Sequence, residues 1–138
     1  MQKKHKNKAI TSFLASILGS IGVHRFYLAG ANDKWGWLHL ASLPLSLILS
    51  RHFFNLPLLA TMSPFVLSFL ASILEALVLG LIADEKWDAK YNLNSGQQSD
   101  TSWPLALSLV LTVGLGAMAL IAVLARSFDL LYTGGAYG

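Results

Sequence analysis

Residues 19–30 read GSIGVHRFYLAG and place a histidine and an arginine directly behind the first apolar run of the chain. That run, Ala9–Val23, has fifteen residues without a charge, and four lysines lie within the eight residues before it. A basic flank followed by an apolar run is typical of a membrane-spanning helix whose N-terminus lies inside. The charges of His24 and Arg25 then mark the water–lipid boundary, and Gly30 permits a tight reversal of the chain.

The whole chain has the composition of a membrane protein. Of its 138 residues, 54% are hydrophobic and 12% are charged, which is about half of the 25% typical of soluble domains. The net charge of +3 comes from lysines ahead of the first apolar run, so it indicates orientation in a bilayer, and we expect no nucleic-acid partner. The chain has no cysteine, which excludes a disulfide, a thiolate nucleophile and an iron–sulfur cluster.

Four segments have the features of transmembrane helices. The apolar stretch 56–83 would measure about 42 Å as one helix, whereas the hydrocarbon core of a bilayer is about 30 Å thick. Ser63-Pro64 is a helix-start signal that divides it. We therefore expect an all-α integral membrane protein, a helical hairpin plus two further transmembrane helices. The predicted segments are a hairpin with a basic flank (1–50, with spans 8–23 and 35–50), an interfacial linker (51–62), a third helix (63–83), an acidic outer loop (84–102), a fourth helix (103–125) and a short tail (126–138).

Charge and tryptophan positions predict four spans with both termini inside, N-in/C-in. Six of the ten lysines and arginines would lie inside, four of the seven acidic residues fall in the 84–102 loop, and all four tryptophans fall at the outer boundary. We expect a multi-pass protein of the bacterial inner (cytoplasmic) membrane. A cleaved signal peptide is the competing interpretation, because Ala29-Gly30-Ala31 offers a cleavage site. His24 and Arg25 would lie between the apolar run and that site, so we expect the segment to be retained.

Glu75 is the only acidic side chain inside a predicted span, about 12 Å below its outer end. A carboxylate at that depth should face other helices and have a partner. His39 and Arg25 lie at similar predicted depth. Two interpretations stay open: an ion or proton relay through Glu75 and His39, and a structural clasp in which Arg25 pairs with Glu75.

Small residues predict surfaces for helix packing, because helices approach closely in a bilayer where side chains are small. The predicted packing positions are Gly19, Gly22, Gly116, Ala119, Ala122 and Ala125. The heptapeptide SFLASIL also occurs twice, at 12–18 and 68–74. With four spans, the two copies would lie on helices that run parallel to one another.

The stretch 19–30, preceded by a short lysine-flanked span and followed by a second span, resembles the TM-two domain family. That family consists of small membrane proteins with two helices joined by a short loop that carries an Asp-Arg-Phe or His-Arg-Phe motif. The resemblance places the loop motif on His24, Arg25, Phe26, Tyr27 and Gly30. It extends more loosely to Glu75 and to DEKWDAKYN (84–92), whereas the fourth helix lies beyond the domain. The resemblance implies a membrane location and a helical hairpin, and it implies no particular activity.

No enzyme signature is found in the sequence. The four histidines form no H-E-x-x-H or i,i+4 pair, and the chain has neither a G-x-S-x-G elbow nor a phosphate loop. We expect no enzyme, no metal and no cofactor. The leading hypothesis is a non-catalytic accessory or scaffolding protein that contacts the lipid bilayer and either a membrane-protein partner or itself. The alternative is a small homo-oligomer that conducts ions or protons through Glu75 and His39.

Overall fold

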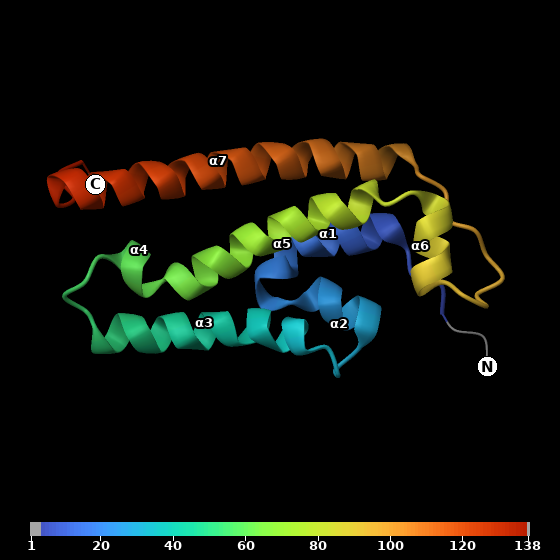
Figure 1. The fold of residues 1–138 in the computed structure, drawn as a ribbon, viewed down its shortest axis with the longest axis horizontal. Coiled ribbons are helices and arrows are strands. Elements are labelled where there is room, and N and C mark those ends of the chain that lie inside the picture. The colour runs from blue at the N-terminus through green and yellow to red at the C-terminus, as the bar shows by residue number, and fades with distance from the viewer. Residues whose placement is uncertain (1–3, 138) are drawn as a thin grey trace.

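The computed structural model describes residues 4–137; residues 1–3 and 138, which belong to the predicted 1–50 and 126–138 segments, lie outside the described residues. The described part is all-α, as predicted, and contains no β-strand. Figure 1 shows α3, α5 and α7 side by side along the long axis, with α1 against one half of α5 and α2 beside α1 and the start of α3. The elements are α1 (Lys8–Leu18), η1 (Gly19–Ile21, a 3₁₀ turn), α2 (Val23–Ala29), α3 (Lys34–His52), α4 (Leu58–Thr61), α5 (Ser63–Leu81), α6 (Asp84–Tyr91) and α7 (Trp103–Thr133).

The first apolar run does not cross the bundle. Asn7 caps α1 by accepting from the amide of Ile10 at 3.0 Å, but the 11 residues of α1 extend only about 16 Å, half of a hydrocarbon core. Gly22 then adopts φ 79°, a left-handed conformation that ends helices, and α2 returns toward the N-terminal end. The ammonium of Lys6 donates to the carbonyl of Tyr27 at 2.5 Å, which joins the two open ends of this pair. The predicted span 8–23 is therefore not one helix. Helix α1 enters the bundle and α2 turns back toward the end from which α1 came; these two helices are called the re-entrant pair below.

The basic N-terminal segment and the 84–102 loop lie at the same end of the bundle. Lys8 donates to the carboxylate of Asp84, to the carbonyl of Ile82 at 2.9 Å and to the hydroxyl of Thr101 at 2.9 Å. The pair α1 and α2 turns back within the bundle, whereas α3, α5 and α7 each run once along it, and α7 ends at the end opposite to Lys8 and this loop (Figure 1). The structure does not confirm the N-in/C-in prediction, which put Lys8 and this loop on opposite sides, because Lys8 and Asp84 are in contact.

Two helices in the described part of the chain are long and apolar enough to span a membrane. They are α5, with a mean hydropathy of 2.1, and α7, with 2.5. Helix α3 has the same 19-residue length as α5, but Lys34, His39 and Arg51 lower its apolarity. The prediction of four apolar spans is therefore not supported, although the α5–α7 pair remains typical of a membrane protein.

The helices bury small polar side chains and expose large apolar ones. The leucines and valine on the outer face of α5 are 63–74% exposed, as expected where lipid takes the place of water. The large apolar side chains that are fully buried are few, chiefly Trp87 and Leu105. Seven serines are buried between the helices: Ser12, Ser16, Ser20, Ser42, Ser46, Ser68 and Ser72.

The two SFLASIL copies lie on α1 and α5, which pack closely against each other. The hydroxyl of Ser12 donates to the carbonyl of Ala76 at 3.0 Å, while a Cβ added to Gly19 would lie 2.5 Å from the Cβ of Ser72. Increasing residue numbers along α1 therefore meet decreasing residue numbers along α5. The two copies are antiparallel, and the prediction that they are parallel is wrong. The re-entrant turn is the reason. It returns the chain to the end where α1 begins, so α3 runs in the same direction as α1 and α5 runs in the opposite direction.

Three boundaries differ from the predicted ones. Helix α3 continues through Pro44 to His52, which shortens the linker, and the linker contains the short helix α4. Pro64 lies in the first turn of α5, although the helix begins at Ser63 and Met62 occupies the cap position. Helix α7 continues to Thr133, so most of the predicted tail is helical, because residues 126–133 contain neither glycine nor proline.

Candidate functional site

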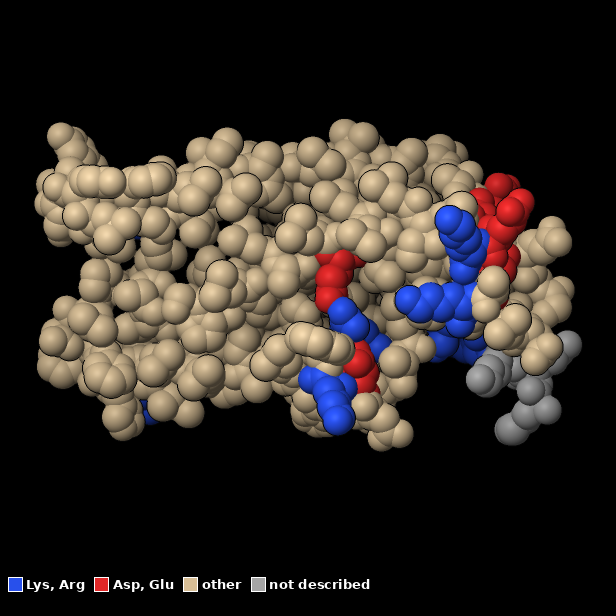
Figure 2. Space-filling model, viewed as in Figure 1, with Lys and Arg blue, Asp and Glu red and all other residues tan. Residues whose placement is uncertain are grey.

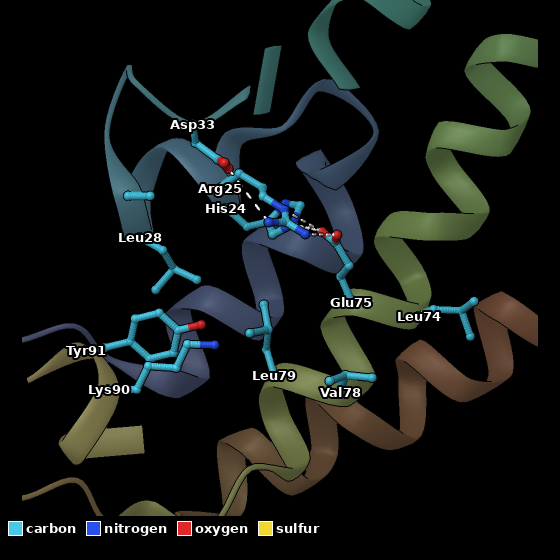
Figure 3. Close-up of a pocket in the computed structure, with 11 residues that line it drawn as sticks. His24, Arg25, Leu28, Asp33, Leu74, Glu75, Val78, Leu79, Lys90 and Tyr91 are labelled. Atoms are coloured by element: carbon cyan, nitrogen blue, oxygen red, sulfur yellow. Dashed lines mark hydrogen bonds and ion pairs between the residues drawn. The ribbon is translucent and has the colours of Figure 1, made fainter. Parts of the chain in front are cut away.

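Glu75 of α5 is held by two consecutive side chains of α2. Its carboxylate accepts hydrogen bonds from Nε2 of His24 and from Nη2 of Arg25, and Nε of Arg25 donates to Oε2 at 3.1 Å. Figure 3 shows both side chains reaching from α2 to the same carboxylate. The fork of Arg25 thus grips Glu75 with two nitrogens, the geometry of a bidentate ion pair. The Arg25–Glu75 clasp anticipated from the sequence is present in the structure.

The turn at Gly22 sets the direction of these side chains. A Cβ added to Gly22 would lie 2.5 Å from the carbonyl oxygen of Gly36, so only glycine lets the turn approach α3 this closely. Asp33 caps α3 by accepting from the amides of residues 35 and 36, and its carboxylate lies 3.8 Å from Arg25. One arginine therefore connects α2 to the start of α3 and to α5.

His39 extends the polar cluster toward the middle of the bundle. Its Nε2 lies 3.7 Å from Oε2 of Glu75, and its Nδ1 lies 2.6 Å from the hydroxyl of Ser68, which donates to the carbonyl of Ser20 at 2.7 Å. The ring of His24 meets the ring of His39 edge to face at 5.8 Å, and Nδ1 of His24 is buried without a hydrogen-bond partner. Glu75 and His39, which sequence analysis paired, lie together, and His24 joins them.

Glu75 lies between two cavities. One, of about 320 Å³, is bounded by α2, α5 and α6 and is lined by Arg25, Asp33 and Lys90. The other, of about 410 Å³, lies between α3 and α5 and is lined by His39 and by apolar side chains such as Trp35. Glu75 lines both, so it is the polar group at which a charged space and a mainly apolar space meet.

The remaining motif residues lie on α2 and at its C-terminal end. The ring of Phe26 lies against Gly36 and meets the ring of Trp37 at 5.5 Å. The hydroxyl of Tyr27 accepts from the amide of Asn7 at 3.2 Å. Gly30 has φ 77° and its amide donates to the carbonyl of Phe26 at the end of α2. These residues join α2 to its neighbours.

The contact between the N-terminal segment and α6 was not predicted from the sequence. Trp87, predicted to lie in a boundary belt, is fully buried, and its Nε1 donates to the carbonyl of Lys6 at 2.9 Å. The side chain of Asn92 accepts from the amide of Lys6 at 2.7 Å. The ammonium of Lys8, hydrogen-bonded to Asp84, lowers the pKa of that carboxyl. The acidic residues at 84–88 and the lysines of the N-terminal segment carry opposite charges, and this is the signal that could have predicted the contact.

The predicted small-residue surface of α7 is only partly covered. A Cβ on Gly116 would lie 2.6 Å from Cγ2 of Ile73, so this position packs against α5. Ala119 is half-buried, whereas Ala122 and Ala125 are exposed. The predicted packing positions Gly19 and Gly22 are both in close contact, as described above. Among residues 4–137, no group of three or more metal-ligating side chains is placed to hold an ion.

Residues 4–50, about a third of the chain, match the family model of the TM2 domain. The match covers the re-entrant pair, the loop motif and most of α3, and it confirms the resemblance to the TM-two domain family. Together with the two long apolar helices, it identifies a membrane protein. Searches of curated proteins and of solved structures found no match to the chain.

Proposed function

We propose that this protein is a non-catalytic accessory or scaffolding subunit that binds another membrane protein within the bilayer. The observation that carries the proposal is an apolar groove of about 700 Å³ between α1 and α7. Helix α7 has 31 residues, of which only Leu105 and Thr112 are buried. A multi-pass location in the bacterial inner membrane is part of the proposal.

The groove has the features by which helices associate in lipid. Between its walls the hydroxyls of Ser16 and Thr112 lie 2.6 Å apart, and Ser16 also donates to the carbonyl of Ser12, so these polar groups are satisfied within the protein. A Cβ added to Gly114 would meet no atom within 4 Å, so its backbone is open to close approach by another helix. Small residues with accessible backbone favour helix–helix contact in a bilayer.

The Glu75 cluster is consistent with a non-catalytic role. Its carboxylate is occupied by Arg25 and His24, and the hydroxyl beside His39 is hydrogen-bonded to backbone. No side chain of the cluster is placed as a nucleophile next to a free base. The cluster therefore supports the proposal as the element that fixes the re-entrant pair against α5.

Extraction from native membranes in mild detergent, followed by mass determination and identification of co-purifying proteins, tests the proposal. We expect a stoichiometric partner that is lost from Gly114→Leu, which fills the open groove. Ala106→Leu is the matched control, because Ala106 is exposed on the same helix outside the groove, and it should retain the partner. A homo-oligomer without a partner, or equal loss in both variants, would contradict the accessory role.

A second candidate is a homo-oligomer that conducts protons through Glu75 and His39. It is favoured by one observation, the position of Glu75 on the walls of both cavities, with His39 on the wall of the cavity between α3 and α5. The protein reconstituted in liposomes should then pass protons under a pH gradient, and Glu75→Gln should abolish the flux. A flux that Glu75→Gln leaves unchanged would exclude this pathway.

A further inference from the structure

A further cavity adjoins the charged cavity between α2, α5 and α6. It measures about 440 Å³ and shares four lining residues with the first, including Lys90 and Tyr91 of α6. The remaining walls come from the N-terminal segment and from the end of α2. The two spaces form one composite cavity where α2, α6 and the N-terminus meet, near the end of α5.

The composite cavity carries an excess of positive charge. Its walls hold four cationic side chains and two carboxylates, and both carboxylates lie beside the guanidinium of Arg25. Among residues 4–137, Lys4, Lys6 and Lys90 form no salt bridge. Figure 2 shows charged side chains gathered around α2 and α6, while the surface toward the far end of the bundle is almost uncharged. Three lysine charges thus remain available to an anion.

Two of these ammonium groups are held in position by tyrosine rings. Nζ of Lys6 lies 4.7 Å from the ring centroid of Tyr27, and Nζ of Lys90 lies 5.1 Å from that of Tyr91. Cation–π contacts of this kind leave part of each ammonium able to donate to a further acceptor. Figure 3 shows Lys90 and Tyr91 on the α6 side of the cavity, across from Glu75 and Arg25.

One wall of the cavity is apolar and opens to the membrane-facing side of α5. Leu74 and Val78 line it, and they are 64% and 63% exposed. Leu28 of α2 lines both parts of the cavity. A ligand that filled this space would meet cations at one end and an apolar surface continuous with lipid along its side.

We propose that the composite cavity binds an anionic phosphate-bearing lipid, with the phosphate among Lys4, Lys6 and Lys90 and an acyl chain along Leu74 and Val78. Lysines near a membrane surface attract anionic headgroups, and the apolar wall distinguishes a lipid from a soluble phosphate ester. The site uses residues other than those of the α1–α7 groove, so it is independent of the accessory role.

Titration of the full-length protein in detergent, followed by thermal melting, tests the proposal. The probes are short-chain phosphatidylglycerol, phosphatidylcholine with the same chains, and glycerol phosphate. We expect phosphatidylglycerol to raise Tm in a saturable manner and phosphatidylcholine to leave it unchanged. Lys90→Gln should weaken the phosphatidylglycerol interaction about fivefold. Lys86→Gln, which removes the same charge from an exposed position on the same helix outside the cavity, should not.

The outcomes separate the sources of the phosphate. Weaker binding in Lys90→Gln but not in Lys86→Gln, with glycerol phosphate much weaker than the lipid, supports the proposal. Glycerol phosphate that binds as tightly as the lipid would overturn the lipid assignment, and an equal effect of both lipids would overturn anion recognition. Lys4→Gln provides a second variant at an exposed position and should behave as Lys90→Gln does.

Discussion

The clasp between Arg25 and Glu75 should couple the re-entrant pair to α5 energetically. Removing one partner of a fully buried ion pair costs about 3–5 kcal/mol, while an exposed pair contributes about 0.2–1 kcal/mol. The side chains of Arg25 and Glu75 are 30% and 24% exposed, between these limits. We therefore expect Arg25→Gln and Glu75→Gln each to lower the free energy of unfolding by about 2 kcal/mol.

The double variant decides whether the two side chains act together. Contacting residues show coupling energies of about 0.5–3 kcal/mol, and a coupling of about 1.5 kcal/mol would leave the double variant only about 2.5 kcal/mol less stable than the parent. For a chain of this size 1 kcal/mol corresponds to about 4 °C in Tm. Each single variant should then lose about 8 °C and the double variant about 10 °C, where additivity would require about 16 °C.

Circular dichroism during thermal melting in detergent measures these losses. Arg51→Gln is the matched control, because Arg51 is exposed at the other end of the bundle and takes part in no salt bridge of the described residues. It should change Tm by no more than about 2 °C. Additive losses in the double variant would refute the clasp, and Arg25 would then be an independent interfacial anchor.

Three further predictions concern packing, pH and topology. Gly19→Ala places a Cβ 2.5 Å from α5 and should cost about 1–3 kcal/mol, whereas Gly114→Ala meets open space and should stabilise the helix by up to about 1 kcal/mol; melting distinguishes them. The pKa of Asp84 is lowered in the folded state, so its stabilisation is present above about pH 4 and is lost as the pH falls through the folded pKa. Asp84→Asn should therefore melt at a lower temperature than the parent at pH 7 and lose less stability than the parent below pH 4. Equal losses of Tm for parent and variant below pH 4 would contradict the Lys8 contact. Single cysteines in this cysteine-free chain, labelled with an impermeant maleimide, test the topology at positions Lys4, Gln97 and Asn55. The first two should react from one side of the membrane and the third from the other; reaction of the first two from opposite sides would restore the predicted four-span arrangement.

Several features of this protein could be predicted because they depend on local sequence. Asn7 caps α1 because its side chain accepts from an amide three residues on, and Pro64 falls in the first turn of α5 because its missing N–H is tolerated there. The pairing of Arg25 with Glu75 was also predictable, because a carboxylate within an apolar segment requires a nearby cation.

The reversal of the chain after α1 could not be predicted in the same way. Ala9–Val23 is uncharged and flanked by lysines, so charge and hydropathy alone predict a span. The chain reverses at Gly22 because glycine tolerates the left-handed conformation that stops α1 halfway. A glycine near the end of an apolar run is equally compatible with a full span and with a turn, and contacts with α3 and α5 decide between them.

The sequence by itself determined an all-α protein with the composition of a membrane protein and a segment, residues 4–50, that matches the TM2 domain model, because composition, apolar runs and a short motif are local properties. Only the tertiary structure decided which end of the bundle each charge occupies. It brought Lys8 to Asp84, buried Trp87, placed His24 beside Glu75, and joined two cavities into one cationic space. These contacts join residues 50 or more positions apart, and their partners are selected by the turn at Gly22, which sets the direction in which the helices after it run past α1.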